Sequence, residues 1–300
     1  MEKFIFNAKD NKLITTFKWL IRKPKAIVQI IHGMAEHAKR YDEFAKFLNE
    51  NGYSVYATDH RGHGETLESN EMLGEIGKDG FNKMIEDEIL LTEIIKKENN
   101  NLPVYVLGHS MGSFILQEYV IRNSKNIRKA IFSGSCGKMG LELNFGKIIA
   151  KLEMGNNKVK PSKIIDFLNF GMFNLKFKNK KTKQDWLNRD EKEVEKYIKD
   201  PLCGGIFPSQ FYYYFYDGLI KLKDLSRLNN INKNLEIYIF SGEMDPVGQF
   251  GKGVKRLYDA YKNTGIKDVS MKLYRDGRHE MLNELNKQEV YRDILEFFKK

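Results

Sequence analysis

Cysteine is scarce in this sequence, and long apolar runs are absent from it. Its 300 residues contain two cysteines, Cys136 and Cys203, too few and too far apart for a disulfide scaffold or a thiolate metal site. No stretch approaches the roughly 18 consecutive apolar residues that indicate a membrane span. The first 33 residues also lack the pattern of an export signal. We therefore expect a soluble protein of the reducing cytoplasm.

The sequence also lacks an acidic balance, since its formal net charge is +10. Asp and Glu are interspersed among the lysines in nearly every segment, so a solvated surface is expected and nucleic-acid binding is not. One cluster has no acid among its lysines and adjoins the apolar run 164–177. Such a patch suits transient contact with a lipid surface. The cluster consists of Lys176, Lys178, Lys180, Lys181 and Lys183.

Apolar strands alternate with amphipathic helices along most of the chain. Two short β-like runs, 3–7 and 13–20, flank a turn and predict an opening hairpin. Alternation after a hairpin predicts a mostly parallel sheet with helices on both faces. The predicted strands are 26–31, 54–58, 104–107, 129–133, 235–240 and 269–274, and the predicted helices are 41–51, 80–99, 112–123, 253–263 and 287–299.

The alternation stops at about residue 135 and resumes only at Leu235. The intervening stretch has helical patches and an aromatic run, but no convincing buried strand. We therefore predict a core built from residues 1–135 and 223–300, with residues 136–222 inserted as a helical cap. Most of the apolar side chains of this cap are expected to pack on the core. They include Phe145, Ile148, Ile149, Leu152, Ile165, Phe167, Leu168, Phe170, Met172 and Phe173.

Ser110 is the candidate nucleophile. It lies in Gly108-His109-Ser110-Met111-Gly112, directly between a predicted strand and a predicted helix. The G-x-S-x-G pattern at such a junction is typical of a sharp turn that lifts the serine oxygen above the sheet. A serine hydroxyl needs a general base within hydrogen-bond reach, and the base needs a carboxylate that fixes its tautomer.

His279 is the predicted base, because it alone of the six histidines follows a late strand. Asp245 is the predicted carboxylate, in a loop after strand 235–240 at the same sheet edge. The order serine, acid, histidine along the chain is that of the α/β-hydrolase fold. Three other acids compete with Asp245 for this role: Asp276, Asp268 and Glu243.

The oxyanion of an acyl-transfer transition state requires hydrogen-bond donors. The backbone N–H of Met111 is the first candidate, because it follows the nucleophile. The second is the N–H of Met34, in the loop His32-Gly33-Met34-Ala35-Glu36-His37 after strand 26–31. Glu36 and His37 are expected to organise this loop by hydrogen bonds, and Glu280 is expected to be a support residue.

Several blocks of the sequence resemble the monoglyceride lipase and lysophospholipase branch of the α/β-hydrolases, also called serine aminopeptidase-like hydrolases. The blocks are residues 32–41, 59–64, 108–112, 186–190, 200–204, 241–246 and 277–280. The resemblance implies a mobile cap over an apolar acyl tunnel, Met34 and Met111 as oxyanion donors, no cofactor and no metal. It also makes Asp59-His60-Arg61-Gly62-His63-Gly64 a structural loop, although its two histidines and acid would suit a metal.

The leading hypothesis is a serine hydrolase that cleaves acyl esters such as monoacylglycerol or lysophospholipid. Alternatives are a general short-chain carboxylesterase and a peptidase of the iminopeptidase type, although iminopeptidases carry tryptophan where this chain has Met111. Epoxide and haloalkane chemistry is excluded, because it uses aspartate at the position of Ser110. A binding protein without activity on the same scaffold is a further alternative. Nothing in the sequence indicates an oligomeric state.

Overall fold

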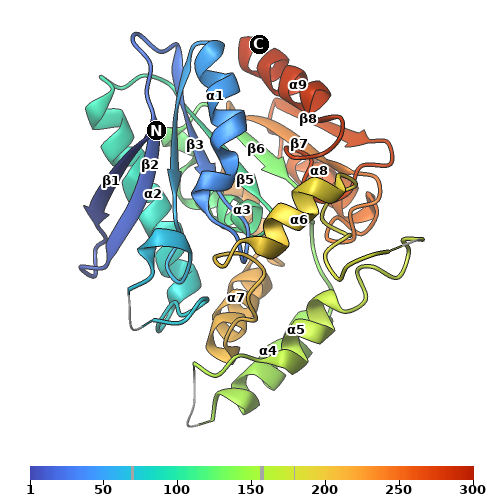
Figure 1. Cartoon of the computed structure of the whole chain (residues 1–300). Coiled ribbons are helices and arrows are strands. Elements are labelled where there is room, and N and C mark those ends of the chain that lie inside the picture. The colour runs from blue at the N-terminus through green and yellow to red at the C-terminus, as the bar shows by residue number, and fades with distance from the viewer. Residues whose placement is uncertain (69–70, 156–158, 179) are drawn as a thin grey trace.

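The computed structural model describes residues 1–68, 71–155, 159–178 and 180–300. Within these ranges, eight strands form one sheet in the order β1-β2-β4-β3-β5-β6-β7-β8 (Figure 1). The strands are β1 Glu2–Asn7, β2 Leu13–Trp19, β3 Ala26–Ile31, β4 Tyr53–Thr58, β5 Val104–His109, β6 Lys129–Ser133, β7 Glu236–Gly242 and β8 Asp268–Tyr274.

The sheet is parallel except at one edge. β1 pairs antiparallel with β2, and β2 pairs antiparallel with β4, whereas the pairs from β4 onward across the sheet are parallel. This arrangement confirms the predicted opening hairpin and the predicted mostly parallel sheet. All parallel strands therefore present their carboxyl ends at one edge, where the loops that carry the predicted site residues leave the sheet.

Helices cover both faces of the sheet. Alternate residues of β3 show why, because Ile27 and Ile31 join the core beneath one set of helices, whereas Val28 and Ile30 join the core beneath the other. The first set is α2 Gly80–Glu98, α3 Met111–Asn123 and α8 Lys252–Asn263. The second set is α1 Asp42–Glu50 and α9 Lys287–Lys299.

The chain between β6 and β7 forms four α-helices in its described part. Figure 1 shows α4 and α5 at the bottom of the view, away from the strands, with α7 between them and the sheet. α4 packs closely on α7, whose aromatic residues reach the core beneath α2 and α3. The helices are α4 Glu142–Met154, α5 Lys163–Phe170, α6 Glu191–Lys199 and α7 Ser209–Lys221.

The prediction that most apolar side chains of 136–222 pack on the core was wrong for α4 and α5. Six of the ten predicted side chains are more than half exposed, whereas Ile165 is fully buried. Three of the exposed ones lie on α4 at intervals of three and four residues, two are neighbours on α5, and Met172 follows α5, so each helix turns apolar side chains outward. They are Phe145, Ile148, Leu152, Phe167, Leu168 and Met172.

None of the described helices combines the length and apolarity needed to cross a bilayer.

Candidate active site

Ser110 occupies a strained turn between β5 and α3. Its backbone has φ +52° and ψ −120°, a combination that non-glycine residues rarely adopt. Two close approaches require the flanking glycines. A Cβ on Gly112 would lie 2.0 Å from the carbonyl oxygen of Ile31, and one on Gly108 would lie 2.4 Å from that of Gly112. The glycines therefore let α3 start against β3, which leaves the Ser110 side chain partly exposed at the sheet edge.

His279 and Asp245 lie together at the carboxyl edge of the sheet. Asp245 follows β7, and His279 follows β8, the neighbouring strand. The Nδ1–H of His279 donates to Oδ1 of Asp245 over 2.9 Å, which leaves Nε2 as the acceptor nitrogen. Asp245 also accepts hydrogen bonds from the hydroxyl of Ser241 and the backbone N–H of Val247. The carboxylate is thus held by three donors in a fully buried position.

Each partner of this pair changes the pKa of the other. Burial raises the pKa of Asp245, but the charge of His279 and the hydrogen-bond donors lower it further, so the pKa lies below its usual value. Burial lowers the pKa of His279, but the nearby Asp245 carboxylate raises it more, so this pKa lies above its usual value. Asp245 therefore stabilises the imidazolium that forms when His279 accepts a proton.

The other three carboxylates considered for Asp245's role lie elsewhere. Glu243 and Asp276 are exposed, and the carboxylate of Asp276 has Nε of Arg275 at 3.7 Å from its Oδ2. Asp268 begins β8, at the end of the strand opposite to His279. Among the described residues, Asp245 is the one carboxylate that hydrogen bonds to the His279 ring.

The loop after β3 brings its backbone close to Ser110. A Cβ on Gly33 would lie 3.2 Å from the Cβ of Ser110. Within the described part of the chain, the N–H groups of Met34 and Met111 make no hydrogen bond. Free N–H groups beside the serine are what an oxyanion hole requires. Their role as donors stays a prediction.

Arg40 joins the loop after β3 to the histidine loop, a role that the sequence analysis missed. Glu36 accepts hydrogen bonds from the N–H of Gly33 at 2.6 Å and from Arg40 at 2.7 Å. The guanidinium of Arg40 also binds both carboxylate oxygens of Glu280, at 2.7 and 2.8 Å. Glu36 and Glu280 therefore share one cation, the guanidinium of Arg40, whose side chain is 11% exposed.

Residues of the 136–222 segment pack directly on His279. The ring of Trp186 lies 5.1 Å from the His279 ring, and Phe170 and Phe173 pack on Trp186. Arg278 donates a 2.9 Å hydrogen bond to the carbonyl of Asn188, which ties the same segment to the histidine loop. The ring centroid of His109 also lies 4.7 Å from that of His279. The His279 ring is therefore in contact with both the Trp186 and the His109 rings.

The loop 59–64 makes hydrogen bonds that are structural. Asp59 accepts the backbone N–H groups of Ala38 and Glu65 at 2.8 and 2.7 Å. Nε2–H of His60 donates to the carbonyl of His32, and its Nδ1 lies 3.3 Å from Oε1 of the buried Glu88. The hydrogen bond from His60 therefore fixes loop 59–64 against His32, the first residue of the loop after β3.

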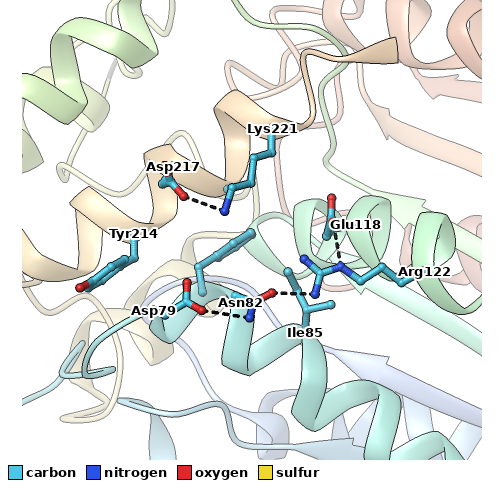
Figure 2. A pocket seen from close by; sticks show the side chains of 10 residues that line it. Asp79, Asn82, Ile85, Glu118, Arg122, Tyr214, Asp217 and Lys221 are labelled. Atoms are coloured by element: carbon cyan, nitrogen blue, oxygen red, sulfur yellow. Dashed lines mark hydrogen bonds and ion pairs between the residues drawn. The ribbon is translucent and has the colours of Figure 1, made fainter. Parts of the chain in front are cut away.

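A separate pocket lies between α2, α3 and α7 (Figure 2), and the predicted site residues do not line it. Its charged side chains bond to one another rather than pointing free into the space. Such mutually paired groups provide no activated nucleophile. The bonds are Asn82 to Asp79 at 3.0 Å, Arg122 to Glu118 at 2.6 Å and Lys221 to Asp217 at 2.9 Å.

Known proteins are similar to this chain over most of its length. Residues 22–286 match a family model described as serine aminopeptidase, S33. A monoacylglycerol lipase of Mycolicibacterium smegmatis is 27% identical over 280 residues, which cover 90% of this chain and 87% of that protein. A monoglyceride lipase of Mus musculus is 27% identical, with 87% and 78% covered. A thermostable carboxyl esterase of Bacillus coagulans, solved with glycerol, has TM-score 0.90 and 28% identity, with 99% and 97% covered.

Proposed function

The chain belongs to the serine aminopeptidase S33 family, and from this premise we propose that Ser110 forms an acyl-enzyme with esters that carry an acyl chain. The protein is a carboxylic ester hydrolase, as its lipase and esterase relatives are. The proposed substrates are of the monoacylglycerol or lysophospholipid type. The observation that carries the proposal is the hydrogen bond from His279 to buried Asp245, at the sheet edge where Ser110 is partly exposed.

The proposed reaction has two halves. Nε2 of His279 takes the proton of the Ser110 hydroxyl while the serine oxygen attacks the ester carbonyl. The N–H groups of Met34 and Met111 would stabilise the oxyanion. His279 then gives the proton to the leaving alcohol. In the second half, His279 takes a proton from water as the water oxygen attacks the acyl carbonyl, and it returns this proton to the Ser110 oxygen as the carboxylic acid leaves. Asp245 stays ionised throughout, because its pKa is held below the usual range.

Three observations favour an ester with an apolar acyl chain. Trp186, Phe170 and Phe173 form an apolar wall against His279. The Mycolicibacterium smegmatis and Mus musculus relatives are named as lipases of monoacylglycerol, and the similar esterase was solved with glycerol. We therefore assign residues 136–222 to a cap that contacts the acyl chain, on a core of residues 1–135 and 223–300.

The same cap is proposed to contact lipid surfaces. The outward face of α4 and α5 carries apolar side chains that are 55 to 76% exposed, among them Leu152 and Phe167. Exposed lysines accompany this face, with Lys151 and Lys163 on the helices and the 176–183 cluster beyond them. An apolar face beside cationic side chains suits insertion at an anionic lipid surface.

The proposed location is the cytoplasm. The free thiols of Cys136 and Cys203 accord with this location.

The test of the nucleophile is Ser110→Ala. We expect loss of ester cleavage and of fluorophosphonate labelling, with an unchanged circular dichroism spectrum. Ser226→Ala, at an exposed serine of η4 Leu225–Asn230, should retain both activities. Ester cleavage that persists in Ser110→Ala would refute the assignment.

A substrate panel separates the alternatives. We expect medium- and long-chain monoacylglycerols or lysophosphatidylcholine to have a higher kcat/KM than acetyl esters. Faster cleavage of acetyl esters would indicate a short-chain carboxylesterase, and cleavage of a proline arylamide would indicate a peptidase.

A pair of variants tests the carboxylate. Asp245→Asn should lower kcat strongly, whereas the exposed Asp276→Asn should leave kcat near the wild-type value.

The lipid-surface proposal has its own test. Vesicles containing about one third phosphatidylglycerol should sediment the wild-type protein, and neutral phosphatidylcholine vesicles should sediment less of it. The double variant Leu152→Ser, Phe167→Ser should lose this binding while it still cleaves a water-soluble ester. Equal sedimentation of wild type and double variant would contradict the assignment of this face.

A further inference from the structure

Three side chains with metal-ligand atoms meet beside the loop after β3. A ring nitrogen of His37, a carboxylate oxygen of Asp200 and the sulfur of Cys203 all lie within 4.8 Å of one another. They form the one such group of three or more found in the part of the chain that the structure describes. His37 is the last residue of the loop after β3, whereas the other two lie between α6 and α7. The cluster therefore joins two segments that are 163 residues apart.

We propose that His37, Asp200 and Cys203 form a binding site for Zn²⁺, with water as the fourth ligand. Imidazole nitrogen, carboxylate oxygen and thiolate sulfur are the three ligand types that zinc takes in proteins. In a tetrahedral site their atoms would be roughly 3.3–3.7 Å apart. Nε2 of His37 and Oδ2 of Asp200 are now 2.8 Å apart and hydrogen bonded, so small side-chain rotations would admit the ion.

The backbone around Asp200 presents two of the ligands on one short turn. The N–H of Cys203 donates to the carbonyl of Asp200 at 3.0 Å, which closes the turn. The N–H of Leu202 donates to Oδ1 of Asp200 at 2.9 Å, so Oδ2 is the oxygen left to face His37. A ligand whose second oxygen is already hydrogen bonded is oriented in the way metal sites require.

Charge and access both suit a divalent cation. Cys203 is buried, but the Asp200 side chain is 31% exposed and gives the ion a route from solvent. The charge of Arg40 acts on Asp200 and Cys203, but Arg40 already binds Glu36 and Glu280. Two carboxylates on one guanidinium leave a net negative charge beside the cluster, to which Asp200 adds.

Zinc binding would exchange one hydrogen bond for three metal bonds. The Cys203 thiol gives its proton to solvent and binds as thiolate, and the His37 ring keeps one proton on its other nitrogen and stays neutral. The ion would then fix residues 200–204 against the loop that carries Met34. One backbone bond already joins these segments, because the N–H of Gly204 donates to the carbonyl of Ala35 at 3.0 Å.

The test uses Co²⁺ as a spectroscopic probe and Zn²⁺ as the competing ion, on the full chain. Co²⁺ should give a thiolate charge-transfer absorption in the near ultraviolet with one equivalent bound, and Zn²⁺ should abolish it. Cys203→Ser should remove the absorption, and His37→Gln should weaken binding by at least about tenfold. Cys136→Ser is the matched control, since it removes the other cysteine and should leave the absorption and the affinity unchanged.

A second readout is thermal stability. Saturating Zn²⁺ should raise Tm for wild type and Cys136→Ser but not for Cys203→Ser, because an ion that binds only the folded chain stabilises it. The proposal is overturned if Co²⁺ gives no thiolate absorption, or if Cys203→Ser binds as tightly as wild type. Neither readout depends on ester cleavage, so failure here leaves the role of Ser110 untouched.

Discussion

Glu88 offers the sharpest quantitative test of the structure. It lies on α2 beneath the loop after β3, is fully buried, and accepts a 2.6 Å hydrogen bond from Nε2 of Gln29. Its other oxygen lies 3.3 Å from Nδ1 of His60. Burial raises the pKa of Glu88 from 4.5 to about 8 and lowers the pKa of His60 to about 3. Both side chains are therefore neutral at pH 7.

The sign of the pH effect follows from proton binding. Between pH 4.5 and 8 the folded chain keeps a proton on Glu88 that the unfolded chain has lost, so this group's contribution to stability falls as pH rises. The loss is about 1.4 kcal/mol per pH unit, and about 5 kcal/mol over the whole interval. Glu88→Gln removes the titration and keeps the hydrogen bond from Gln29, because its amide oxygen can accept in place of Oε2.

Urea unfolding at pH 5.5 and 7.5 measures the effect. The free energy of unfolding of Glu88→Gln minus that of wild type should rise by about 3 kcal/mol between these two pH values. Glu86→Gln, at a partly exposed position of the same helix, should give a difference that stays constant. Parallel stability curves for wild type and Glu88→Gln would refute the argument.

Three further perturbations test the site. The raised pKa of His279 should place the acidic limb of the kcat/KM profile above pH 6.5, and Asp245→Asn should move it to lower pH while kcat falls by about 10⁴. Gly112→Ala should abolish fluorophosphonate labelling and lower Tm, since its Cβ would meet the Ile31 carbonyl at 2.0 Å. Arg40→Met should destabilise the fold by about 3–5 kcal/mol in urea unfolding, because two buried carboxylates lose their cation; an effect below 1 kcal/mol would contradict the importance of this network.

Local patterns in the sequence were enough for the core of the fold. Short, mainly apolar runs predicted β3 and β6 with their observed bounds, because a strand buried on both faces of a sheet is mostly apolar. The polar exceptions are Gln29 within β3 and Lys129 and Ser133 at the two ends of β6. Gly108 and Gly112 marked the turn at Ser110 in the sequence. The structure gives the reason for the second glycine, because β3 passes too close to leave room for a side chain at Gly112. The order of Ser110, Asp245 and His279 followed from the strands they succeed.

The sequence could not select among groups that only folding brings together. Asp245, Glu243 and Asp276 are all near the ends of the last two strands, and burial against His279 singles out Asp245. Arg40 bonds to a glutamate 240 residues away, a contact that no local pattern indicates. Helical spacing in α4 and α5 revealed an apolar face but not its direction. Periodicity records which side of an element is apolar, whereas the neighbour or solvent that meets this side depends on the path of the whole chain.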